Sequence, residues 1–316
     1  MFKKFLLLAV VLFPYYLIAQ DDLLSELEDE IVEEKQVVSS IFKGIKIVNF
    51  ESTKLVGEKQ LQFVISHRFG SLENGFDTLL GLDDASVRIQ FVYGVTDWLH
   101  LSASRSGVGQ TYDLAAKYHL IRQKEGGFPF TIAGYNIVNL NTALDRDALP
   151  ELQFADRFGY ASQLLISRKF SDWLSLQLIP TFFHDNTVIE DGQDNSQFAL
   201  GFGGRLKLTK RFALIGDWGI HLNRVENSQF NNALGIGVEI ETGGHVFQLH
   251  FSNSQAIFAN GFLGQAGGDF ADGDIFFGFN LSRAFSTGKW GEKRRQKKQD
   301  DATDTSTTLN NVLQKT

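Results

Sequence analysis

The most constraining feature of this sequence is a tight polar turn that joins two runs of alternating residues. Within residues 169–178 one alternating run ends, Ser171-Asp172 makes the turn, Trp173 follows, and a second run begins. The design recurs at residues 95–101 and, more loosely, at 208–214. Such a short turn joins only antiparallel neighbours, and a Trp beside it suits a chain that crosses between water and an apolar medium. The pattern therefore predicts a transmembrane antiparallel β-barrel.

Alternating runs continue from residue 58 to residue 285, with apolar side chains on one face and polar or small ones on the other. Most runs have at least the nine to eleven residues, roughly, that a tilted strand needs to cross a bilayer, whereas a soluble strand usually has about five or six. The twelve predicted strands are residues 58–70, 84–94, 98–106, 110–122, 128–140, 154–169, 173–184, 196–208, 211–223, 231–241, 244–253 and 272–285.

The connections between these strands provide a second test. The short ones are residues 95–97, 123–127, 170–172, 209–210 and 242–243, and the mostly long ones are 71–83, 107–109, 141–153, 185–195, 224–230 and 254–271. Short and long connections alternate without a break, as in an up-and-down transmembrane barrel with short periplasmic turns and longer outer loops. Both termini are then expected in the periplasm. A soluble lipocalin-like barrel is the alternative, but it would have a polar exterior and an apolar interior.

The termini lie outside this pattern. Residues 1–20 have the basic start, short apolar run and small Ala19 of a secretory signal, and they are too short for a spanning helix. Residues 21–57 begin with an acidic stretch at 21–34, and residues 44–55 are open to three interpretations: a plug, a periplasmic extension or an extra strand. Residues 58–285 form the predicted barrel, and residues 286–316 form a periplasmic tail with a basic cluster at 289–298.

If the apolar faces meet lipid, the opposite faces form a lumen of mixed charge. The tentative lumen residues are Arg68, Arg88, Asp113, Lys117, Arg157, Arg205, Asp217, Glu239 and His250. Two interpretations stay open for them. A basic wall opposite an acidic one would orient polar solutes, whereas a network of ion pairs would fill and stiffen a closed barrel. Trp98 and Trp173 are expected to mark the membrane interface at the short-turn rim.

The chemistry-bearing residues favour no enzyme. His250 and Ser252 lie two residues apart on one strand face, the arrangement of outer-membrane phospholipases, but His100 and Ser102 repeat the spacing by chance. The chain has no Cys, and its seven His are scattered, so neither a metal site nor a cofactor is expected. A net charge of −7 argues against nucleic acid as a partner. The loop 254–271 is unusually apolar and is open to three interpretations: an inward constriction or hatch, packing on lipid, or packing against its neighbours.

Three runs, at residues 65–70, 81–88 and 277–283, give the sequence a family resemblance. They resemble a Bacteroidetes-type family of uncharacterised outer-membrane β-barrels, which is classed as a domain of unknown function. The resemblance covers roughly residues 45–285. It implies the fold and the location, and it supplies no activity or site residues.

The sequence thus predicts an outer-membrane channel or transporter for small solutes, with membrane lipid around it. The alternative is a closed structural or docking barrel that binds a periplasmic protein through residues 21–34 or 289–298. A lipid hydrolase is the third interpretation. Conductance of the refolded barrel would separate the first two.

Overall fold

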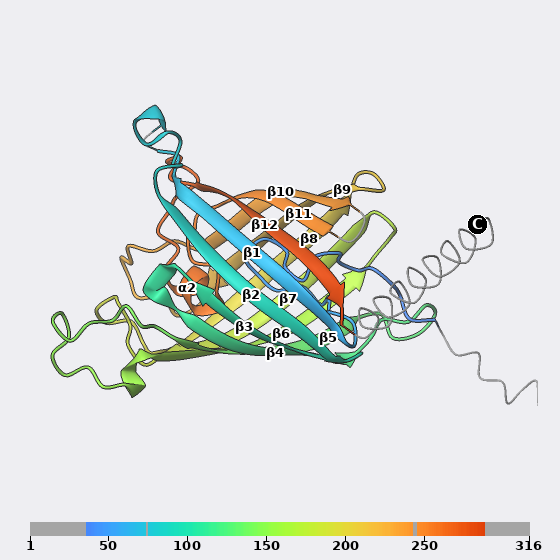
Figure 1. The fold of residues 1–316 in the computed structure, drawn as a ribbon, viewed down its shortest axis with the longest axis horizontal. Coiled ribbons are helices and arrows are strands. Elements are labelled where there is room, and N and C mark those ends of the chain that lie inside the picture. The colour runs from blue at the N-terminus through green and yellow to red at the C-terminus, as the bar shows by residue number, and fades with distance from the viewer. Residues whose placement is uncertain (1–35, 74, 243–244, 288–316) are drawn as a thin grey trace, which may run out of the picture.

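The computed structural model describes residues 36–73, 75–242 and 245–287 as a closed antiparallel β-barrel (Figure 1). It confirms the predicted fold. The signal at 1–20, the acidic stretch at 21–34 and the basic cluster at 289–298 lie outside the described residues. The strands are β1 (Gln60–Ser71), β2 (Ala85–Thr96), β3 (Leu99–Ser106), β4 (Tyr112–Ile121), β5 (Thr131–Leu140), β6 (Phe158–Lys169), β7 (Leu174–Asp185), β8 (Ser196–Lys207), β9 (Phe212–His221), β10 (Ala233–Thr242), β11 (His245–Ser252) and β12 (Phe276–Ser286).

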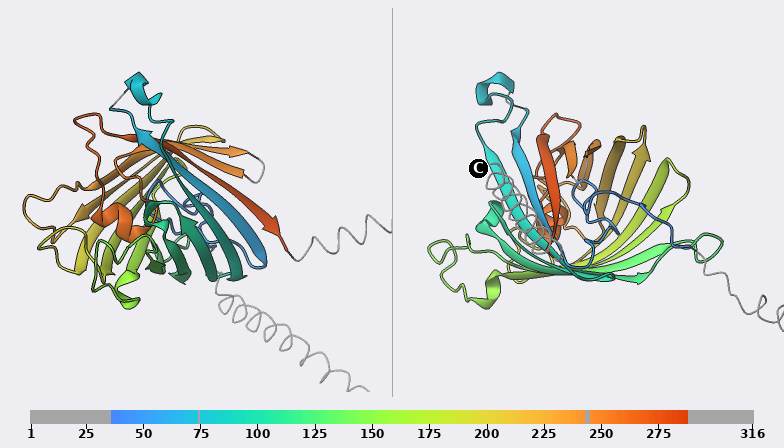
Figure 2. Two further views of the ribbon diagram at one scale, coloured as in Figure 1. Left: turned by 60° about the vertical axis from the view of Figure 1, so that its left-hand side comes forward. Right: turned by 45° about the vertical axis from the view of Figure 1, so that its right-hand side comes forward.

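Each strand pairs with its neighbours in sequence, and β1 closes the barrel against β12. The closing register pairs Leu61 with Phe285 and His67 with Phe279. Closure leaves no strand edge, which matters in lipid because an unpaired backbone N–H or C=O has no water to bind there. The views in Figure 2 show the ring of tilted strands and the segment that runs through its interior.

The two faces of the strands separate by polarity as the alternation predicts. On β9, Leu214 and Trp218 are exposed on the outside, whereas Ile215 and Asp217 are buried on the inside. The inner face also carries buried Arg, Lys, Gln and Ser side chains on many strands. None of the helices in the described part of the chain is long and apolar enough to cross a membrane.

The connections alternate between a short-connection end and a long-connection end of the barrel. The long-connection end holds the helical turns η1 (Gly75–Thr78), η2 (Val108–Gln110) and η3 (Ala155–Arg157) and the short helix α2 (Ala259–Gly264). One short connection, residues 122–130, is longer than the predicted turn. It pairs with the incoming N-terminal segment: the Val38 N–H donates to the Gln123 carbonyl (2.9 Å), and the Glu125 N–H to the Gln36 carbonyl (3.0 Å).

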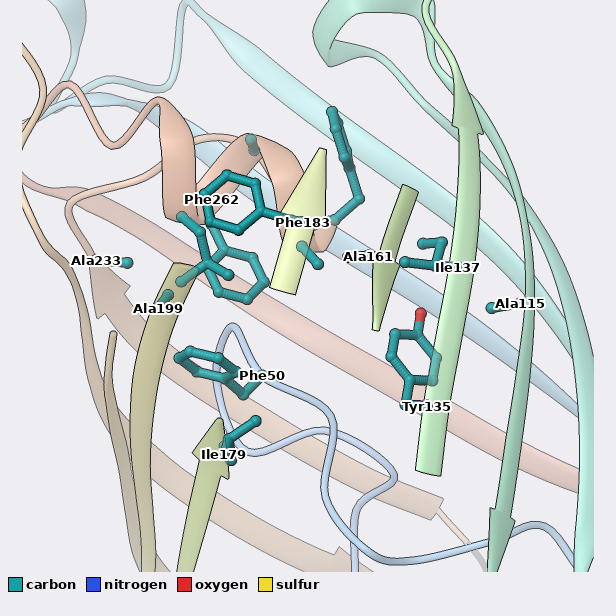
Figure 3. Packing of buried hydrophobic residues seen from close by; sticks show 14 of the residues in the cluster. Phe50, Ala115, Tyr135, Ile137, Ala161, Ile179, Phe183, Ala199, Ala233 and Phe262 are labelled. Atoms are coloured by element: carbon teal, nitrogen blue, oxygen red, sulfur yellow. The ribbon is translucent and has the colours of Figure 1, made fainter. Parts of the chain in front are cut away.

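Two segments fill the interior. Residues 41–56 enter from the short-connection end and are almost entirely buried, so residues 44–55 lie inside the barrel as a plug. From the opposite end the β11–β12 loop folds inward and buries Ile257, Phe262 and Leu263. The two segments meet where the Phe50 and Phe262 rings pack edge to face, with centroids 4.8 Å apart (Figure 3). The core of this protein is therefore the filled centre of the barrel.

The outward apolar belt leads to a test of membrane insertion. Leu178 lies on the outer face of β7, so Leu178→Arg would place a guanidinium against lipid, at a cost of about 2–4 kcal/mol. Leu208→Arg, just beyond the end of β8, should cost about 1 kcal/mol or less, because the side chain reaches the interface. Urea unfolding in lipid vesicles measures both free energies. Equal losses at the two positions would contradict a lipid-facing belt.

Candidate functional site

The plug, residues 41–56, is an irregular segment that turns back on itself at its tip. The Ile47 N–H donates to the Phe50 carbonyl, and the Ser52 N–H to the Ile45 carbonyl, both at 2.9 Å. This tight turn leaves the N–H groups of residues 48–50 without partners inside the plug. Since the tip is buried, the barrel wall has to supply acceptors.

Asp217 on β9 provides those acceptors. One oxygen, Oδ2, accepts the backbone N–H groups of Val48 (2.9 Å), Asn49 (2.7 Å) and Phe50 (2.9 Å), while Oδ1 accepts the Asn49 side-chain amide (3.0 Å). Consecutive N–H groups in a turn form a concave site for an anion. Here the anion is a carboxylate of the barrel itself, which fixes the plug tip to the wall.

Glycines on the inner face make room for the plug's apolar side chains. A Cβ at Gly203 would lie 2.3 Å from Ile47 Cδ1, and one at Gly201 would lie 2.6 Å from Phe50 Cζ. A Cβ at Gly219 on the next strand would lie 3.0 Å from the same Phe50 atom. The glycine-rich run 201–204 continues β8 without a register shift and accommodates the plug.

A second anchor joins the plug to β4. The Glu51 carboxylate pairs with Lys46 Nζ (2.9 Å) within the plug and with Lys117 Nζ (2.8 Å) on the wall. Lys117 also donates to the carbonyls of Ile45 (3.0 Å) and Ser52 (2.9 Å). Burial alone would raise the pKa of the Glu51 carboxyl, but the two ammonium groups hold that pKa well below its usual range.

Other wall charges pair with each other and also touch the inserted segments. Arg205 Nε lies 2.7 Å from Glu239 Oε1, and the other Glu239 oxygen accepts the Gly44 N–H at 3.2 Å. Arg88 pairs with Asp113 at 2.8 Å and donates to the Ile257 carbonyl of the inward loop at 3.4 Å. Both pairs therefore support the plug or the loop as well as each other.

Arg68 is the exception among the buried wall cations. Its Nη2 donates to the Val48 carbonyl at 3.4 Å and to Asn49 Oδ1 at 3.5 Å, both at the plug tip. Within the described residues it forms no ion pair. The barrel thus holds the tip with a carboxylate on one side and a guanidinium on the other.

Eight of the nine tentative lumen residues are buried inside the barrel: Arg68, Arg88, Asp113, Lys117, Arg205, Asp217, Glu239 and His250. The structure places Arg157 elsewhere. It ends η3, because β6 starts only at Phe158, and its guanidinium donates to carbonyls of Asn141 and Leu144 in the preceding loop. Arg88 pairs with Asp113, and Arg205 pairs with Glu239, inside the barrel, so these charges do not form two facing walls of opposite sign.

Trp98 and Trp173 are exposed beside short connections, and their position at a membrane interface stays a prediction. The roles of Lys46, Asn49 and Glu51 were not predicted from the sequence. Their signal was present but indirect: inner-face glycines on neighbouring strands left space that an apolar segment preceding the first strand could fill.

The geometry provides no nucleophile–base pair at His250 and Ser252. The Ser252 hydroxyl donates to Asn49 Oδ1 (3.1 Å), while neither ring nitrogen of buried His250 has a hydrogen-bond partner. A His that activates a Ser must contact it and be oriented by a third group. Within the described ranges, no three His, Asp or Glu side chains gather in a way that could hold a metal ion.

Fold and interior together define a membrane-type β-barrel whose lumen is occupied by its own chain. The family comparison agrees with this class. Residues 42–285 match the family model described as "Membrane bound beta barrel domain (DUF5777)", and the chain belongs to that family. The predicted membership of an uncharacterised barrel family is confirmed, whereas a Bacteroidetes-type source stays a prediction. No curated protein matches the sequence.

Several solved barrels are distantly similar. The KdgM porin has 8% sequence identity and a TM-score of 0.42, with 72% of this chain and 98% of that chain covered. An outer membrane channel from Pseudomonas putida F1 has 15% identity and a TM-score of 0.44, with 73% and 97% covered. LpxR from Salmonella typhimurium has 10% identity and a TM-score of 0.33, with 72% and 99% covered. Likenesses at this level carry no argument about function.

The Asp217 contacts lead to a test of plug anchoring. Because the chain has no Cys, Val48→Cys at the buried tip is a clean reporter for a water-soluble maleimide. Adding Asp217→Asn removes the charge that accepts three N–H groups, so labelling should accelerate by about tenfold or more.

Asp172→Asn in the same Val48→Cys background is the control, because exposed Asp172 pairs with Lys169 at the rim. Its labelling rate should equal that of the parent. An unchanged rate in the Asp217→Asn variant would mean that the other contacts suffice to hold the tip.

Proposed function

We propose that this protein is an outer-membrane channel for small solutes, gated by its own N-terminal plug. The observation that carries the proposal is the occupation of the lumen by residues 41–56, held by the wall through polar and ionic contacts. Outer-membrane barrels usually have their short connections in the periplasm, so the short-connection end of this barrel is placed there. The plug then enters from the periplasm, and both described chain ends, near residues 36 and 287, lie on that side.

The polar character of the plug's contacts favours a displaceable plug over a permanent filling. Buried ion pairs give little net stability compared with apolar packing of the same volume. A barrel that only had to stay closed would lose nothing with an apolar interior. Here Asp217, Lys117 and Glu239 offer charges that water or a polar solute can satisfy once the plug moves. The wall that remains is lined with Gln, Ser and paired charges, which suits polar solutes.

The inward loop forms a second closure. Ile257, Phe262 and Leu263 of this loop are buried, and its helix α2 contacts β6, β7 and β9. Within α2, Asn260 Nδ2 donates to Asp185 Oδ1 at 2.8 Å. This apolar loop sits at the end opposite the plug's entry. We propose that passage requires both segments to move, the plug first, because its Phe50 supports Phe262.

A closed docking barrel is the second candidate, favoured by the same filling from both ends. In that case residues 21–34 or 289–298 would bind a periplasmic protein, and the barrel would serve as an anchor. The lipid hydrolase is not favoured, since His250 does not contact Ser252 and both are buried in the lumen.

Single-channel recording after insertion into planar bilayers tests the gate. The Asp217→Asn variant should show current steps with an open fraction about tenfold or more above the parent. Adding Thr53→Cys and Ser167→Cys should lock the plug under oxidation, because the two hydroxyl oxygens lie 2.7 Å apart. The steps should then vanish and return with a reductant.

Ser167→Cys alone, in the Asp217→Asn background, is the matched control and should respond to neither oxidant nor reductant. If Asp217→Asn frees the plug tip to maleimide yet the bilayer stays silent, the channel proposal fails and the docking barrel remains. Steps that persist after cross-linking would place the conducting path somewhere other than past the plug.

A further inference from the structure

The outer wall of the barrel has a hollow that the channel proposal does not use. Its volume is about 570 Å³, and it extends over strands β4 to β8 and reaches Leu222, just beyond the end of β9. Leu164, Phe182 and Phe198 are among its apolar side chains, and the Phe182 and Phe198 rings pack with centroids 5.4 Å apart.

The hollow exists because small residues interrupt the outward belt. Gly134 is paired with Tyr118, and a Cβ there would lie 2.4 Å from the Tyr118 ring, so the ring lies flat over this glycine. Asn136 and Ser162, also small, face each other across β5 and β6. Larger side chains surround them, which leaves a depression in the wall.

Three polar side chains form a hydrogen-bonded row at the floor of this hollow. The Tyr118 hydroxyl donates to Asn136 Oδ1 at 3.1 Å, and Asn136 Nδ2 donates to Ser162 Oγ at 2.7 Å. Asn136 and Ser162 are exposed, and Tyr118 is half-buried. Among the hydrogen bonds of the described residues, none uses the second Asn136 amide proton or the Ser162 hydroxyl proton.

The depth of this row makes it unusual. Asn136 is the third of five outward positions on β5, after Ile132 and Gly134 and before Val138 and Leu140. It therefore lies at the middle of the strand, where the belt faces the centre of the bilayer. Polar groups at that depth are costly and rare, and they usually mark a functional site where another group satisfies their hydrogen bonds.

We infer that the hollow binds one apolar chain from the bilayer that carries a hydroxyl group partway along its length. Mostly apolar walls with a few placed polar groups are the usual composition of a ligand site, and the volume is in the usual range. The ligand hydroxyl would accept a hydrogen bond from the Asn136 amide or the Ser162 hydroxyl and donate one to a remaining lone pair of these residues. An unsubstituted acyl chain fills the same space but leaves these groups unsatisfied.

The shape favours such a ligand over a second copy of the protein. Two copies related by a twofold axis would place one hollow against the other and leave both empty, and empty space at an interface forfeits packing. A single chain that lies along the wall fills the hollow and reaches its polar floor.

The test uses two phosphatidylethanolamines that differ by one hydroxyl, one with ricinoleoyl chains and one with oleoyl chains. The full-length protein is taken from nanodiscs that contain equal amounts of both, and native mass spectrometry measures which lipid stays bound. The parent should retain the ricinoleoyl lipid over the oleoyl lipid by about fivefold or more. Asn136→Leu should abolish that preference, and the milder Ser162→Ala should reduce it.

Ile89→Ala is the control, since Ile89 is an exposed outward residue on β2, away from the hollow. It should keep the full preference. Heat-modifiable mobility in gels checks that each variant is folded. If Asn136→Leu does not fold, the Ser162→Ala variant alone provides the test. Equal retention of the two lipids by the parent would overturn the proposal. So would a dimer mass that Asn136→Leu eliminates, because the surface would then be an interface between copies.

Discussion

The interior of this barrel depends on one requirement: an irregular buried backbone must have partners for its polar groups. The plug has no sheet or helix to satisfy them, so the wall does so with charges of opposite sign. The Asp217 carboxylate accepts three consecutive N–H groups, and the Lys117 ammonium group donates to three nearby carbonyls. Hydrogen bonds to charged groups are stronger than neutral ones, which compensates for the lack of regular structure. The glycines around the tip, the Glu51 pairs and the contact with Phe262 all require the tip in this position.

The barrel was predictable because its information is local. In a strand with one polar and one apolar face, the side-chain polarity alternates with a period of two residues. A turn of two or three residues then fixes which neighbouring strand it pairs with. The predicted inward residues Arg88, Lys117 and Asp217 follow from that period alone. Arg157 was wrongly predicted to lie in the lumen because the alternation of polar and apolar residues does not show where a strand begins. The alternation extends to residues before β6, but the chain forms a helical turn there.

The sequence left the plug as one of three interpretations of residues 44–55, because the residues that the plug contacts are distant in the chain. Glu51 pairs with Lys117, and Asn49 pairs with Asp217, across separations that no periodicity reveals. A polar inner face was consistent with both an open pore and a filled one. What decides between them is whether each charge faces water or another charge, and that depends on the three-dimensional arrangement.

The short link between the plug and β1 has a kinetic consequence. Val56 is buried in the lumen and β1 begins at Gln60, so only residues 57–59 separate the plug from the wall. A displaced plug therefore stays at the mouth of the barrel at an effective concentration on the order of millimolar or above. Return to the closed state is then an intramolecular step, which is independent of protein concentration. A barrel built in this way reseals itself, and each opening is limited by the length of its own tether.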